Sequence, residues 1–95
     1  ARADLAPFDQ VHSEYYLKFR VVDKPGVLSR IAGVLGSHAI SIASVLQNGQ
    51  GQAAVPIFIV THRAKESDMR AALAEVDRLP DVLDRTKMIR IENNL

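Results

Sequence analysis

Hydrophobic and polar positions along this chain change from a strand-like to a helix-like spacing and back. Apolar and polar residues alternate from Tyr15 to Val22, which is typical of a half-buried strand. Apolar residues then recur at the spacing of one helix face from Val27 to Leu35, and again over 65–78. Leu79-Pro80 ends this second helix, because the residue before a proline resists helical geometry. Further strands are predicted over 40–47, 53–62 and 82–92.

This order of elements, β-α-β-β-α-β, predicts an α+β domain of the ferredoxin-like type. Right-handed crossovers would place both helices on one face of a four-stranded antiparallel sheet. The other face, lined in part by Val45, Val55 or Phe58, would then be covered by nothing in this chain. Exposed apolar surface of this kind marks a protein interface, and a two-fold dimer is the commonest solution.

Pro56 conflicts with the third strand, because proline cannot donate a hydrogen bond to a ladder and avoids central strands. We therefore expect it near the start of the strand, at a bulge or an unpaired position.

Length and composition indicate one globular domain of 95 residues, with 47% apolar and 24% charged residues. We expect residues 1–14 to form a linker, 15–92 the domain and 93–95 a tail, and we expect the chain to be a fragment of a longer protein. No apolar run is long enough for a membrane helix, and no signal peptide is recognisable. The absence of cysteine fits a reducing cytoplasm.

The sequence gives little support for catalysis, metal binding or nucleic-acid binding. No serine has a visible base beside it, so we expect no catalytic residue. His12, His38 and His62 are isolated in sequence, so we expect no metal site. A net charge of +1 argues against a nucleic-acid partner, and the aromatic strand residues lack the motif of an RNA-recognition module.

The turn Asp23-Lys24-Pro25-Gly26 has the chemistry to hold a ligand. Free N–H groups of Gly26, Val27 and Leu28 would form an anion site at the start of the helix. Asp23 could receive an ammonium group, so the turn would suit a free amino acid. In the alternative interpretation, Asp23 merely caps the helix, proline starts it, and glycine relieves crowding.

The run Arg20–Ala32, followed by Ile40-Ser41-Ile42-Ala43-Ser44-Val45, resembles the ACT domain, a small-molecule-sensing module of amino-acid metabolism. The family's usual glycine and asparagine before and within the second strand are replaced here by Ala39 and Ser41. This resemblance covers about residues 15–92.

Three segments are more specifically similar to the C-terminal ACT domain of bacterial homoserine dehydrogenases, namely 15–21, 41–47 and the Val-Pro…Val-Thr-His run within 53–62. That resemblance implies a cytoplasmic parent enzyme that uses NAD(P), with no cofactor in this fragment. It also implies a homodimer that binds threonine at the dimer interface. The implied ligand-binding residues are Asp23, Lys24, Pro25, Gly26, Val27, Leu28, Ser41, Ile42, Ala43 and Gln47. The alternatives are a dimerisation domain without a ligand and an ACT domain of another amino-acid-pathway protein.

Overall fold

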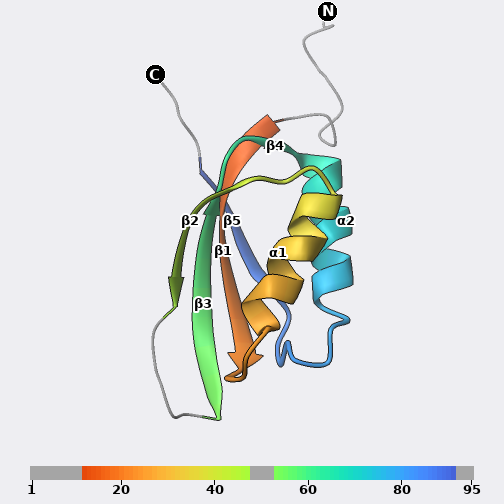
Figure 1. Cartoon of the computed structure of the whole chain (residues 1–95). Helices are drawn as coiled ribbons and strands as arrows, with labels where there is room; N and C mark the ends of the chain where they lie inside the picture. The colour runs from red at the N-terminus through yellow and green to blue at the C-terminus, as the bar shows by residue number, and fades with distance from the viewer. Residues whose placement is uncertain (1–11, 48–52, 92–95) are drawn as a thin grey trace, which may run out of the picture.

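A computed structural model describes residues 12–47 and 53–91 of the chain. Its elements are β1 (His12–Val22), α1 (Val27–Ser37), β2 (Ile42–Gln47), β3 (Ala54–Thr61), β4 (Ala64–Lys65), α2 (Glu66–Val76) and β5 (Lys87–Ile91). The long strands form an antiparallel sheet in which β1 lies between β3 and β5, and β2 lies outside β3. The two-residue β4 pairs with His12 and Ser13 at the start of β1. Both helices lie on the same side of the sheet (Figure 1), so the predicted ferredoxin-like fold is confirmed.

The core forms between this sheet and the two helices. Alternate residues of β1, namely Tyr15, Leu17, Phe19 and Val21, are fully buried, as the strand period requires. Val27, Ile31 and Leu35 of α1 and Met69, Ala72 and Val76 of α2 cover them. The predicted apolar stripes of the helices are therefore the faces that pack. Each helix is short, so this packing rather than helix propensity stabilises it.

The uncovered face of the sheet differs from the prediction in two of its three residues. Val55 is fully buried, because the alternate residues of β3 that include it point toward the helices. Val45 pairs with the buried Ile59 and so lies on the helix side, although it is 41% exposed at the edge of the sheet. Phe58 does lie on the uncovered face, where its ring stacks with Tyr16 at a centroid distance of 6.0 Å.

The first and last strands begin at positions other than those predicted. β1 begins at His12 rather than Tyr15, so it includes residues that the sequence assigned to a linker. β5 begins at Lys87 rather than Val82. The N–H and hydroxyl of Thr86 both donate to Asp77 Oδ1, at 2.9 and 2.6 Å, which holds this residue in the connection between α2 and β5. Residues 1–11 and 93–95 lie outside the described part of the chain.

Pro56 lies near the start of β3, as expected, but not at a bulge. It pairs in register with Arg20 of β1. On the other side of β3, the last described pair with β2 is Ile57 with Gln47. Pro56 therefore has no β2 partner among the described residues. The register shift in this ladder lies instead between Ile42 and Ser44.

Helix α1 ends in a Schellman motif that places an alanine in a left-handed conformation. Ala39 has a φ of 64°. Its N–H donates to the Gly36 carbonyl at 3.0 Å, and the N–H of Ile40 donates to the Leu35 carbonyl at 3.0 Å. These are the two hydrogen bonds of the motif, in which glycine is the usual left-handed residue.

Candidate functional site

The Asp23–Gly26 turn connects the end of β1 to the start of α1. Gly26 is the N-cap of the helix, with φ 87° and ψ −10°, and no side chain caps it. These angles match the third residue of a type II turn, which favours glycine, and Pro25 occupies the preceding position, which favours proline. The helix therefore begins two residues after Pro25. The alternative in which Asp23 caps the helix is wrong, because the glycine takes that position and Asp23 is exposed.

The N–H groups at the start of α1 have no acceptor among the described residues. The N–H of Arg30 is the first that is bonded, to the Gly26 carbonyl at 3.0 Å. Those of Val27, Leu28 and Ser29 precede it and lack an intrahelical partner. Together with the helix dipole, these donors make the start of α1 favourable for an anion.

A cavity of about 360 Å³ opens beside this turn. Its volume falls within the range of about 300–1,000 Å³ that is common for small-molecule sites. The lining residues are Asp23, Lys24, Pro25, Gly26, Val27, Leu28, Ser29 and Gln47. Seven of these eight were candidates from the sequence. Gln47 reaches the cavity because β2 starts near the end of α1 and runs back toward the start of that helix (Figure 1).

Ser29 is the lining residue that the sequence did not identify as a ligand contact. The sequence excludes it as a nucleophile, because no base is visible beside it. Its place in the first turn of a helix whose N-terminus has no side-chain cap is the signal that could have identified it.

Ser41, Ile42 and Ala43 do not line this cavity. They lie at the opposite end of β2 from Gln47. There the Ser41 carbonyl accepts from the N–H of His62 at 2.9 Å, and Ile42 pairs with Thr61. Within one chain, the candidates on the β1–α1 turn are therefore separated from the candidates at the start of β2.

Two cations beside the cavity share one carboxylate. Lys24 Nζ lies 3.3 Å from Asp81 Oδ1, and the Arg30 guanidinium donates to Asp81 Oδ2. The side chain of Asp81 is 11% exposed, whereas those of Lys24 and Arg30 are about half exposed. The hydrogen bond from Arg30, and then Lys24, hold the pKa of the Asp81 carboxyl below its usual value. Asp81 is therefore charged wherever the fold persists near neutral pH.

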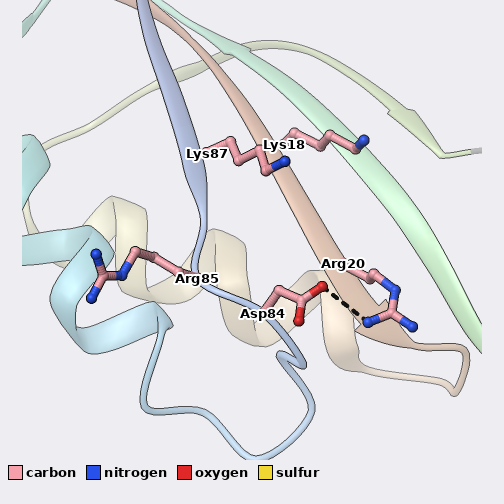
Figure 2. A pocket seen from close by; sticks show the side chains of 5 residues that line it. All are labelled: Lys18, Arg20, Asp84, Arg85 and Lys87. Carbon is pink, nitrogen blue, oxygen red and sulfur yellow. Dashed lines mark hydrogen bonds and ion pairs between the residues drawn. The ribbon is translucent and has the colours of Figure 1, made fainter.

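The segment around Asp81 is also tied to the strand that leads into the turn. The N–H of Val22 donates to the Asp81 carbonyl at 2.9 Å, and that of Leu83 donates to the Arg20 carbonyl at 2.8 Å. Arg20 also pairs with Asp84 at 2.9 Å. This pair lines a second, smaller pocket of about 150 Å³. Figure 2 shows the other lining residues, with Lys18 and Lys87 along neighbouring strands and Arg85 directed away from them.

A buried polar cluster lies apart from the cavity, where β1 meets α2. The Tyr15 hydroxyl donates to Oε1 of Glu66, a carboxylate that is only 3% exposed. Arg70 Nε lies 3.4 Å from the other oxygen of Glu66, and Arg90 lies 3.9 Å from Oε1. Burial, and then this hydrogen bond, raise the pKa of Tyr15 to about 12. The cluster satisfies a buried charge, and none of its residues lines the cavity.

Neither a metal centre nor a membrane span is found in the described part of the chain. It has no group of three or more histidine, cysteine, aspartate or glutamate side chains placed to hold a metal ion. None of its helices has the length and apolar character needed to cross a membrane.

Comparison with known proteins gives a consistent result. The family model of the ACT domain matches residues 15–81. Homoserine dehydrogenases from Methylobacillus glycogenes and Helicobacter pylori are 36% and 38% identical over 90 residues, which cover 93% and 94% of this chain. These 90 residues are 22% and 21% of those proteins, so the chain spans about a fifth of the curated relatives it matches.

Solved structures agree with this result. A homoserine dehydrogenase from Thiobacillus denitrificans superposes with a TM-score of 0.83 and 33% identity, over 92% of this chain and 19% of that one. The ACT domain of a GTP pyrophosphokinase from Chlorobium tepidum gives a TM-score of 0.67 at 11% identity, over 83% of this chain and all of that one. The second likeness concerns the fold alone.

Proposed function

Because this chain belongs to the ACT domain family, we propose that it is the amino-acid-binding regulatory domain of a homoserine dehydrogenase and that its ligand is threonine. The observation that carries the proposal is the cavity of about 360 Å³ at the start of α1. It combines free main-chain donors with an exposed carboxylate, and a zwitterion needs one receptor of each sign.

In the proposed complex, the ligand carboxylate accepts hydrogen bonds from the N–H groups of Val27, Leu28 and Ser29. Its ammonium group faces Asp23, which has no cation partner among the described residues. The amide of Gln47 lies across the cavity and is the polar group that would meet a hydroxyl on the ligand side chain. Lys24 adds a positive charge beside the carboxylate.

A second copy of the chain completes this proposal. Ser41, Ile42 and Ala43 lie away from the cavity of their own chain, so their role in binding requires that a partner supply them. The uncovered face of the sheet, with Phe58 and the 60%-exposed Ile89, gives an apolar surface for a homodimer.

The catalytic part of the proposed enzyme would lie in the four fifths of the relatives' length that this chain does not span. There NAD(P) would exchange a hydride between aspartate semialdehyde and homoserine, in the cytoplasm. Threonine bound to the ACT domain would favour one arrangement of the dimer. It can shift that equilibrium by no more than its difference in affinity for the two arrangements.

Isothermal titration calorimetry of this chain with threonine, serine, isoleucine, methionine and lysine tests the proposal. We expect heat of binding with threonine and none with lysine or methionine. Analytical ultracentrifugation of the same samples gives the oligomeric state. A dimer that binds none of the five amino acids would overturn the sensing function and support a dimerisation domain without a ligand. Binding of another amino acid in place of threonine would assign the domain to a different pathway.

A further inference from the structure

Lys24 takes part in both the candidate cavity and an ion pair with Asp81. It lines the candidate cavity, and its ammonium group lies 3.3 Å from Asp81 Oδ1. The lysine side chain is 54% exposed, whereas that of Asp81 is 11% exposed. The carboxylate is thus largely enclosed by the fold, while the lysine side chain is half exposed and lies beside the cavity.

Arg30 keeps Asp81 in place independently of Lys24. Its guanidinium donates to Asp81 Oδ2. Its Nη1 atom also lies against Gly26, 3.4 Å from the position that a Cβ on that glycine would occupy. Loss of the Lys24 contact would therefore leave Asp81 paired. Because the Lys24 side chain is about half exposed, solvent screening keeps the free energy of this pair small, so exchanging it is inexpensive.

We propose that Lys24 is shared between Asp81 and the ligand, an inference that rests on the proposed function. In the empty site the lysine pairs with Asp81, and in the occupied site it pairs with the carboxylate of the bound amino acid. Asp81 is then a positioning residue that competes with the ligand for one cation and so weakens binding. If Asp81 only held the turn in place, its loss would weaken ligand binding instead of strengthening it.

The segment that contains Asp81 also connects the site to the sheet through main-chain hydrogen bonds. The Asp81 carbonyl accepts the N–H of Val22, and Leu83 bonds back to Arg20. The same segment leads from α2 into β5. When Lys24 pairs with the ligand, the Asp81 side chain therefore loses one of the two cations that hold it in this segment.

The variant Asp81→Asn tests the competition. We expect it to bind threonine about two- to fivefold more tightly, the factor that corresponds to one solvent-screened ion pair. Stability toward urea should fall at the same time, because Arg30 loses its charged partner. The two measurements move in opposite directions, which a purely structural role for Asp81 does not predict.

Asp84→Asn is the matched control, since it makes the same chemical change three positions along the same segment. Asp84 pairs with Arg20 (Figure 2), neither residue lines the cavity, and both side chains are more than half exposed. The affinity of Asp84→Asn for threonine should equal that of the wild type. The effect of Asp81→Asn should also disappear in a Lys24→Met background.

Three results would overturn the inference. Asp81→Asn could leave the affinity unchanged, it could weaken binding, or it could tighten binding equally in the Lys24→Met background. In each case the wild-type chain binds an amino acid, so the proposed function stands and only the competition fails. If neither the wild type nor Asp81→Asn binds any of the five amino acids, the proposed function fails as well.

Discussion

Replacing Ala39 with glycine is expected to stabilise this domain. Ala39 has a φ of 64°, and the left-handed conformation costs a residue with a Cβ atom about 1–2 kcal/mol. Glycine avoids this cost but loses about 0.5–1 kcal/mol more backbone freedom on folding. At the middle of both ranges the difference is a net gain of about 0.75 kcal/mol for Ala39→Gly.

The surrounding contacts should survive the substitution, so the measurement isolates the backbone conformation. The hydrogen bonds to Gly36 and from Ile40 to Leu35 use main-chain atoms, which the substitution leaves in place. Ile40 is 3% exposed and remains packed after the turn.

Urea unfolding followed by far-ultraviolet circular dichroism measures the effect. We expect a higher midpoint with an unchanged m-value, and a melting temperature about 2–8 °C higher for a domain of this size. Ala32→Gly is the control, because the same change in the interior of α1 should cost about 1 kcal/mol. A loss of stability for Ala39→Gly as large as that for Ala32→Gly would refute the left-handed conformation at Ala39.

Three further substitutions test the turn and the buried cluster. Asp23→Ala should weaken threonine binding by about 1–3 kcal/mol in calorimetry while the urea midpoint stays constant, since Asp23 is exposed and caps nothing. Gly26→Ala should lower the free energy of unfolding by about 1–2 kcal/mol, because φ is 87° and the new Cβ would lie 3.4 Å from Arg30; an unchanged value would contradict the turn geometry. In the wild type, the raised pKa of Tyr15 predicts stability that is complete below pH 10 and declines as pH rises toward 12, because the unfolded tyrosine ionises first. Tyr15→Phe should cost about 1–3 kcal/mol at neutral pH by leaving Glu66 short of a donor, and urea midpoints across alkaline pH should then lack that decline.

Local periodicity was sufficient to predict the elements that pack through one face. Ile31 and Leu35 recur at helical spacing and are fully buried, and Leu17 and Phe19 alternate with exposed residues in β1. The same rule failed near Val82. That residue is 9% exposed and forms only an isolated bridge with Val21, so its apolar character reflects the core and not a continuous strand.

The candidate site could be predicted only where its residues are close in sequence. Asp23 and Gly26 stand in one turn whose chemistry is visible in the sequence itself. Asp81 is 51 positions from Arg30, so the chain must fold before this carboxylate meets the turn. The positions of Val45 and Val55 relative to the helices likewise depend on strand register, which an almost continuous apolar run does not determine.

The proposed anion receptor at the start of α1 consists of peptide groups, and this limits how it can evolve. Exchanging one side chain for another leaves an amide hydrogen in place, and only proline removes it. These amides would recognise what every amino acid has in common. Discrimination between effectors then depends on a few neighbouring side chains such as Leu28 and Gln47. A lineage could therefore acquire a new effector through one or two codon changes and keep the receptor for the shared backbone intact.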